Sequence, residues 1–301
     1  MRIRRVVIGG ALIFLGLPAL LTLLTIVTIR VLDQTNGSLL TSGRVRTYLV
    51  HVPPSYDRTR PTPLVISMHG AAGWPAQQQN LSRWNKVADE KGFIVAYPAG
   101  SGVPKIWHVF HEAGLARDVT FISAMIDTIE RTYNIDSTRI YANGISNGGG
   151  MAFVLSCTMS NRIAAIGLVS AAQTLPWSWC TESRPIPMID FHGTADPIIP
   201  FKGGHSSMAP ETFPDVQTWV SNWAQRDRCA STPKDSALTT NVTRREYTGC
   251  ADSADVVLYM IQGGGHTWPG RQPGTKVLGR ASMNVSANDL IWEFFNRHPM
   301  G

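Results

Sequence analysis

Serine, aspartate and histidine, which together can make a hydroxyl group nucleophilic, each lie near glycine in separate stretches of this chain. Ser146 lies in residues 144–148 (GISNG), Asp196 in 192–196 (HGTAD) and His266 in 263–266 (GGGH). A serine hydroxyl is a weak nucleophile that needs a base, a carboxylate to orient the base, and hydrogen-bond donors for the oxyanion. The residue types therefore predict nucleophilic chemistry at Ser146, provided that the fold brings the three stretches together.

The turn around Ser146 connects two runs of different character. An apolar run with β character (140–142) precedes it, and a helix-compatible run (151–155) follows. On such a background the pattern G-x-S-x-G forces the serine into a strained conformation that exposes its hydroxyl above the sheet. Gly144 and Gly148 are then required, because side chains there would collide with the neighbouring strand and helix. The alternative is a plain glycine-rich turn in which Ser146 only caps the helix.

Asp196 and His266 each follow a predicted strand, at 186–191 and 256–261. Both are therefore expected in loops beyond the carboxyl ends of strands, where open α/β sheets bind their ligands. Asp190 is the rival acid, but it lies inside the first of these strands and should point to a face of the sheet.

Backbone donors for an oxyanion are expected from two places. Residues 69–73 (HGAAG) follow the predicted strand 63–68, so Gly70 or Ala71 can offer an N–H beside that of Asn147. We expect His69 to be a structural hydrogen-bonding residue that holds this loop rather than a base.

The order of apolar segments predicts an α/β fold with one mostly parallel sheet and helices on both faces. Strands are expected at 44–52, 63–68, 93–97, 140–142, 163–169, 186–191 and 256–261, and helices at 119–133, 213–228 and 287–295. We predict a basic segment at 1–5, an apolar segment at 6–30, a polar linker at 31–42 and one catalytic domain at 43–301.

The apolar segment near the N-terminus predicts export. Residues 6–29 contain no charged side chain, and a segment of this length can cross a bilayer. Arg2, Arg4 and Arg5 precede it, which places the N-terminus in the cytoplasm and the domain outside. The run is longer than the apolar region of a signal peptide, so a transmembrane anchor is favoured over a cleaved signal sequence.

The charge of +6 does not predict nucleic-acid binding. Arg2, Arg4, Arg5 and Arg30 flank the apolar segment, and the remaining charges nearly balance. No cationic run interleaved with aromatic residues occurs elsewhere.

The four cysteines are an even number, as expected for an exported protein with disulfides. Proximity along the chain favours Cys157 with Cys180 and Cys229 with Cys250, although all three pairings remain open. No cysteine or histidine spacing typical of zinc sites is present, so we expect no structural metal.

Taken together, the four motifs HGAAG (69–73), GISNGGGM (144–151), HGTADPIIP (192–200) and GGGHTWPG (263–270) resemble one family. It comprises the exported α/β-hydrolase esterases grouped as polyhydroxybutyrate depolymerases and feruloyl esterases. The likeness spans residues 44–295, and the order serine, aspartate, histidine is that of α/β-hydrolases.

The resemblance implies roles for the residues that match these motifs. Ser146 would be the nucleophile, Asp196 the orienting acid and His266 the general base, with no cofactor. It also implies a disulfide between Cys229 and Cys250. Ala71-Ala72 departs from the bulkier or glycine residues common in the family, which leaves the second oxyanion donor open.

The family implies an ester as substrate, whether a small molecule, an oligomer or a polymer. We favour hydroxyalkanoate esters or oligomers, with feruloyl or acetylxylan esters of plant polysaccharides as the alternative. Trp107, Trp177 and Trp268 are candidates for the substrate pocket, although core packing explains such residues equally well. A hypothesis of another class is a non-catalytic, surface-anchored binding protein on a hydrolase scaffold.

Overall fold

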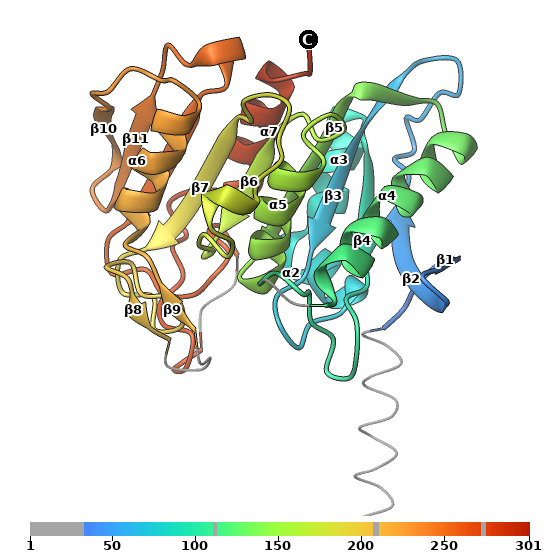
Figure 1. Cartoon of the computed structure of the whole chain (residues 1–301), viewed down its shortest axis with the longest axis horizontal. Helices are drawn as coiled ribbons and strands as arrows, with labels where there is room; N and C mark the ends of the chain where they lie inside the picture. Colours follow the sequence, from blue (N-terminus) through green and yellow to red (C-terminus); the bar gives the residue numbers. More distant parts are fainter. Residues whose placement is uncertain (1–32, 111–112, 207–210, 272–274) are drawn as a thin grey trace, which may run out of the picture.

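The computed structural model describes residues 33–110, 113–206, 211–271 and 275–301. Within these ranges the main sheet has ten strands in the order β1-β2-β4-β3-β5-β6-β7-β12-β11-β10, and a small hairpin (β8, β9) lies apart from it (Figure 1). The strands are β1 (Gly37–Thr41), β2 (Arg44–His51), β3 (Thr62–Met68), β4 (Ile94–Pro98), β5 (Ile135–Ile145), β6 (Ile166–Val169), β7 (Met188–Gly193), β8 (Gly204–His205), β9 (Thr212–Phe213), β10 (Lys234–Thr239), β11 (Val242–Tyr247) and β12 (Val256–Ile261).

The centre of the main sheet is parallel, as the sequence predicts. Strands β4, β3, β5, β6, β7 and β12 run in one direction, while β1 and β2 at one edge and β11 and β10 at the other form antiparallel additions. The carboxyl ends of the six parallel strands therefore meet at one edge of the sheet, where the arrowhead of β7 points in Figure 1.

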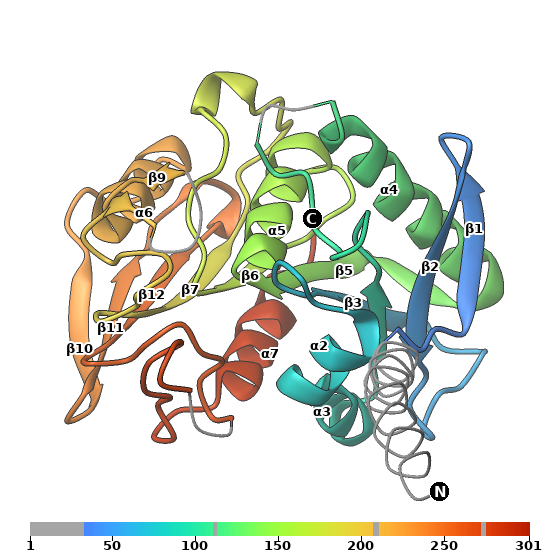
Figure 2. The ribbon, with the colours of Figure 1, turned by 90° about the horizontal axis from the view of Figure 1, so that it is seen from below.

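Helices cover both faces of the sheet, which confirms the predicted layers. Helices α4 (Leu115–Thr132), α5 (Asn147–Thr158) and α6 (Val216–Arg226) lie on one face. Helices α2 (Pro75–Ser82), α3 (Trp84–Lys91) and α7 (Ala287–Arg297) lie on the other (Figure 2). Side chains of β3 alternate between the two layers: Leu64 and Ile66 pack with the first set, and Val65 packs with the second.

Helix α6 illustrates how local sequence produces these elements. The Asp215 side chain accepts a hydrogen bond of 2.9 Å from the N–H of Thr218 and so caps the helix. The apolar residues Trp219, Val220 and Trp223 recur at helical spacing and are fully buried. The helix begins three residues later than predicted, because Phe213 belongs to β9.

The predicted linker at 31–42 is wrong over its second half, since residues 37–41 form β1. Strands β1 and β2 pair with Thr41 opposite Arg44, so only Ser42 and Gly43 form the turn. Both turn residues have positive φ, 50° and 71°, as in the tight turns that match the twist of paired strands. The Ser42-Gly43 pair is a turn signal, but the polar residues around it are also typical of a linker.

A second hairpin, β10–β11, was not anticipated either. It extends the sheet beyond β12 through residues rich in charge, including Arg244 and Arg245. Edge strands exposed to water lack the apolar run of a buried strand, which explains why the pattern did not reveal them.

Both disulfides favoured by proximity are present, Cys157–Cys180 and Cys229–Cys250. The predicted segments 1–5 and 6–30 lie outside the described residues. Among the helices that the structure does describe, none is sufficiently long and apolar to span a bilayer.

Candidate active site

The three predicted loops converge at the carboxyl edge of the parallel sheet. Ser146 directly follows β5, Asp196 follows β7 by three residues, and His266 follows β12 by five. Ser146 and His266 line one cavity of about 610 Å³. Its walls are mainly apolar and include Leu81, Ile106, Trp107, Val109, Phe110, Ile145, Ala172, Ile198, Ile199, Phe213 and Leu278.

The backbone at Ser146 has the strained conformation that the glycine pattern predicts. Its φ of 55° and ψ of −124° are rare for a residue with a side chain. A Cβ atom at Gly148 would lie 2.3 Å from the carbonyl oxygen of Met68, and one at Gly144 would lie 2.4 Å from the backbone of Gly148. Helix α5 can therefore approach strands β3 and β5 this closely only because both positions are glycine.

His266 is held by a buried carboxylate. Its Nδ1 lies 2.9 Å from Oδ2 and 3.1 Å from Oδ1 of Asp196. The Asp196 carboxylate also accepts hydrogen bonds from the N–H groups of Ile198 (2.8 Å) and Ile199 (2.9 Å). With a carboxylate at Nδ1, the imidazole Nε2 is left free to exchange a proton at the cavity.

The pKa of Asp196 is lowered by its hydrogen-bonding partners. Burial by itself would raise the pKa, but the hydrogen bond and charge of His266, the charge of His192 and the N–H of Ile199 outweigh it. Asp196 is therefore maintained as the anion that a paired imidazole requires.

Asp190, the rival acid, does not contact His266. It lies inside β7, fully buried, with its Oδ2 4.0 Å from Nδ1 of His192. Burial raises the pKa of Asp190 well above its usual range, which favours the uncharged acid. His192 donates from Nε2 to the carbonyl oxygen of Ile199 (2.9 Å) and so supports the loop around Asp196.

The loop after β3 presents backbone N–H groups beside Ser146. A Cβ atom at Gly70 would lie 3.5 Å from the Cβ of Ser146. In the described part of the chain, the N–H groups of Ala72 and Gly73 are hydrogen-bonded, whereas those of Gly70 and Ala71 donate to no backbone or side-chain acceptor. The N–H of Asn147 begins helix α5, where the first N–H groups have no partner within the helix.

His69 holds this loop, in the structural role expected from the sequence. Its Nδ1–H donates to the carbonyl oxygen of Gly70 (2.7 Å), and its Nε2 accepts from the N–H of Gly100 (2.9 Å). Burial lowers its pKa from 6.5 to about 4.

The lowered pKa of His69 predicts that the protein becomes less stable as the pH decreases. Between pH 6.5 and 4 the unfolded chain protonates His69 whereas the folded protein does not, so the free energy of unfolding decreases as pH falls. The full shift corresponds to about 3 kcal/mol. We expect urea unfolding at pH 7 and pH 4 to show this loss of unfolding free energy in the wild type. In His69→Asn, the loss between the two pH values should be smaller by about the same amount. Equal losses in both proteins would contradict the assignment.

The loop 98–110 is fixed against the site by two sets of polar contacts. The side chain of Asn147 accepts from the N–H of Trp107 (2.7 Å) and donates to its carbonyl oxygen (2.9 Å). The buried Asp118 accepts from Arg46 (2.7 Å), Ser101 (3.0 Å) and the backbone N–H of His108 (2.9 Å). These contacts position Trp107, the one predicted pocket tryptophan that lines the cavity.

The other two predicted pocket tryptophans, both among the described residues, do not line the cavity. Trp268 is buried, and its Nε1–H donates to Asn288 of helix α7 (2.7 Å). Trp177 lies in the 3-10 turn η1 (Trp177–Trp179), where the guanidinium of Arg226 is 4.7 Å from its ring centre. Position in a loop could not distinguish these cases, because packing depends on what covers the loop.

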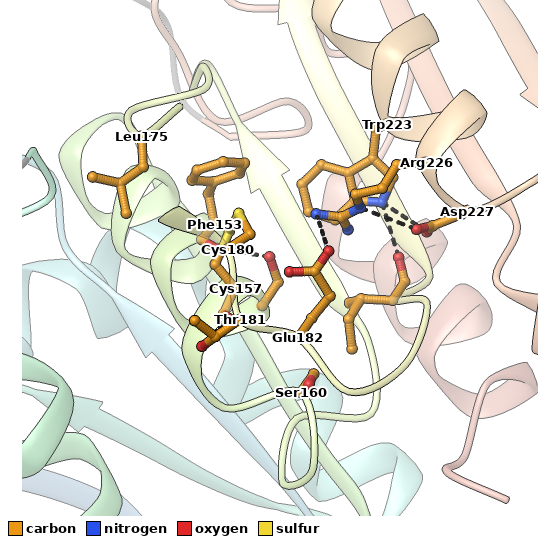
Figure 3. Close-up of polar contacts among 12 residues, drawn as sticks. Phe153, Cys157, Ser160, Leu175, Cys180, Thr181, Glu182, Trp223, Arg226 and Asp227 are labelled. Carbon is orange, nitrogen blue, oxygen red and sulfur yellow. Dashed lines mark hydrogen bonds and ion pairs between the residues drawn. A yellow bond between two sulfur atoms is a disulfide. The ribbon is translucent and has the colours of Figure 1, made fainter. Parts of the chain in front are cut away.

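The segment after β6 is attached to two helices, as Figure 3 shows. Its Cys180 is bonded to Cys157 of α5, and the ring centre of its Trp177 lies 4.7 Å from the guanidinium of Arg226 of α6. Glu182 contacts the same guanidinium at 3.6 Å. The fixed segment carries Ala172 and Thr174, which line the cavity, so these contacts determine one of its walls.

Comparison with known proteins finds esterases that are similar to this chain. Residues 46–174 match the family described as Esterase PHB depolymerase. Feruloyl esterase B from Piromyces equi is 31% identical over 229 residues, which cover 73% of this chain and 42% of the relative, so the chain spans less than half the length of that protein. The putative esterase NocK from Nocardia uniformis subsp. tsuyamanensis is 28% identical, over 84% of this chain and 80% of the relative.

The architecture is also similar to a solved structure, the acetyl xylan esterase from Aspergillus awamori. The TM-score is 0.64 over 86% of this chain and 98% of that one, at 17% identity, which is a likeness of fold. The layered sheet, the strained serine turn and the matching relatives agree with one another. Over residues 46–174 this chain matches the family described as Esterase PHB depolymerase, and the relatives that it resembles include feruloyl esterases.

Proposed function

We propose that this protein is a serine carboxylic-ester hydrolase that works through an acyl-enzyme. The observation that carries the proposal is the buried Asp196–His266 pair, which shares a cavity with a serine in a strained turn. Strained backbone is retained where function requires it, and an imidazole oriented by a carboxylate is the base that a serine nucleophile needs.

The proposed reaction has two halves. Ser146 Oγ attacks the ester carbonyl carbon while His266 Nε2 takes the hydroxyl proton. The oxyanion accepts hydrogen bonds from the N–H groups of Asn147 and of Gly70 or Ala71, and Asp196 stabilises the imidazolium. The intermediate collapses, and the alcohol leaves with the proton from His266. A water molecule, deprotonated by His266, then attacks the acyl-enzyme, and the acid is released as His266 returns the proton to Ser146 Oγ.

The comparisons support two substrate classes. The family description names polyhydroxybutyrate depolymerase, which supports hydroxyalkanoate esters or oligomers. The names of the relatives include feruloyl and acetylxylan esterases, which support esters of plant polysaccharides. Rates of hydrolysis of p-nitrophenyl butyrate, hydroxybutyrate oligomers and methyl ferulate, compared side by side, distinguish these classes.

Covalent labelling separates this enzyme from a non-catalytic binding protein on the same scaffold. We expect the folded full chain to react with a fluorophosphonate probe at Ser146, because attack by Oγ on phosphorus expels fluoride. Mass spectrometry of peptides identifies the site, and heat-denatured protein is the control. A folded protein that remains unlabelled would favour the binding hypothesis.

We also propose that the domain that begins at β1 lies outside the cytoplasm, with residues 6–30 as an anchor or a signal sequence. The two disulfides support this, because such bonds persist in oxidising compartments. Fractionation of producing cells tests the location, and reduced cysteines in a cytoplasmic fraction would exclude it.

A further inference from the structure

One residue of the cavity wall carries a buried polar atom. Gln78 of helix α2 lines the cavity and is only 1% exposed. Within the described residues, its Oε1 has no hydrogen-bond partner. An amide oxygen left in this state costs free energy that a ligand group could recover.

The surrounding hydrogen bonds determine which atom of this amide is the oxygen. The indole N–H of Trp84 can only donate, and it lies 3.1 Å from Oδ1 of Asn143. The Ser67 hydroxyl lies 2.9 Å from the same oxygen and must also donate to it. The Gln78 atom 3.0 Å from Ser67 Oγ must therefore donate in turn, which makes it Nε2.

The consequence is a pure acceptor at a defined place. Ser67, Asn143 and Trp84 are all fully buried, so water cannot replace any partner in this chain of hydrogen bonds. Reversing the Gln78 amide would bring Oε1 to a hydroxyl that is already committed to Asn143. By contrast, the Thr174 hydroxyl on the same cavity, which also has no partner among the described residues, can donate or accept and selects neither type of ligand.

We propose that Gln78 Oε1 accepts a hydrogen bond from a hydroxyl group of the ester substrate. This inference rests on the proposed esterase function and narrows its substrate class. A hydroxylated aromatic ester, a sugar ester or the hydroxyl end of a hydroxyalkanoate oligomer supplies the donor. An internal repeat of a polyester has ester oxygens only and cannot satisfy Gln78.

Matched ester pairs test the proposal on both sides of the ester bond. For the acyl side we compare methyl ferulate with methyl 3,4-dimethoxycinnamate, and for the alcohol side 2-hydroxyethyl butyrate with 2-methoxyethyl butyrate. We expect kcat/KM to favour the hydroxyl ester about tenfold or more in one pair, because the methyl ether leaves the acceptor unpaired. The pair that responds identifies where the hydroxyl lies.

Gln78→Met keeps the length of the side chain and removes the acceptor. We expect the ratio of kcat/KM within the responding pair to fall to about one. The reason is that kcat/KM should decrease for the hydroxyl ester and stay the same for the methyl ether. A ratio does not depend on the fraction of active protein, so partial unfolding cannot imitate this result. Gln79→Met, on the same helix but outside the cavity, is the control and should preserve the wild-type ratio.

Binding to the Ser146→Ala protein separates this inference from the esterase proposal. Calorimetry of the same ester pairs should show the hydroxyl preference, and adding Gln78→Met should abolish it. A wild type that hydrolyses esters without preference in either pair, or a Gln78→Met variant that keeps the preference, would overturn the role of Gln78. No hydrolysis with a preserved binding preference would overturn the esterase proposal instead.

Discussion

Ser146→Ala should reduce kcat/KM for p-nitrophenyl butyrate by a factor of about 10⁴ or more. The substitution removes only the hydroxyl that would form the acyl-enzyme, while the turn, the cavity and the Asp196–His266 pair remain. Any hydrolysis that remains in Ser146→Ala would come from binding of the substrate and from the backbone N–H groups that stabilise the oxyanion. Initial rates with purified full-length protein measure the effect.

Ser156→Ala provides a matched control for this prediction. Ser156 lies on α5, the helix that follows Ser146, and its buried hydroxyl donates to the carbonyl oxygen of Phe153 (2.7 Å). Its loss changes local stability and not the cavity, so the rate should remain within about twofold of the wild type. Ester hydrolysis that persists at the wild-type rate in Ser146→Ala would refute the assigned nucleophile.

Asp196→Asn should lower kcat by a factor of about 10³ to 10⁴. The carboxylate at 2.9 Å from His266 Nδ1 selects the tautomer with Nε2 free, and an amide group can turn its own N–H toward the ring and select the other. The amide also carries no charge to stabilise the imidazolium. Single-turnover and steady-state rates with p-nitrophenyl butyrate would show a fall in kcat with little change in KM.

Asp190→Asn distinguishes this effect from the effect of removing any buried carboxyl group. Asp190 is six residues away on β7, and its raised pKa favours the neutral acid, which an amide resembles in shape and charge. We expect kcat within about threefold of the wild type. Equal losses in the Asp190 and Asp196 variants would contradict the choice of Asp196 as the orienting acid.

Much of the polypeptide path follows from local patterns. Buried parallel strands such as β3 and β12 are continuous apolar runs, and helix α6 shows its apolar stripe and capping aspartate directly in the sequence. Strand β1 and the hairpin β10–β11 are different, because water on one side removes the apolar signal. Strand β1 therefore replaced part of a predicted linker, whereas its partner β2 matches the strand predicted at 44–52.

By itself the sequence determined the candidate serine, aspartate and histidine, since each lies in a glycine-containing turn after a strand and parallel strands bring such turns to one edge. It also favoured both disulfide pairings, because each bridges neighbouring segments. Only the tertiary structure decided which tryptophan faces the cavity, since Trp107, Trp177 and Trp268 all occupy loops and differ in what packs over them. The direction of the Gln78 amide likewise depends on Ser67, Asn143 and Trp84, residues far apart in sequence whose donors and acceptors meet only when β3, β5 and α3 assemble.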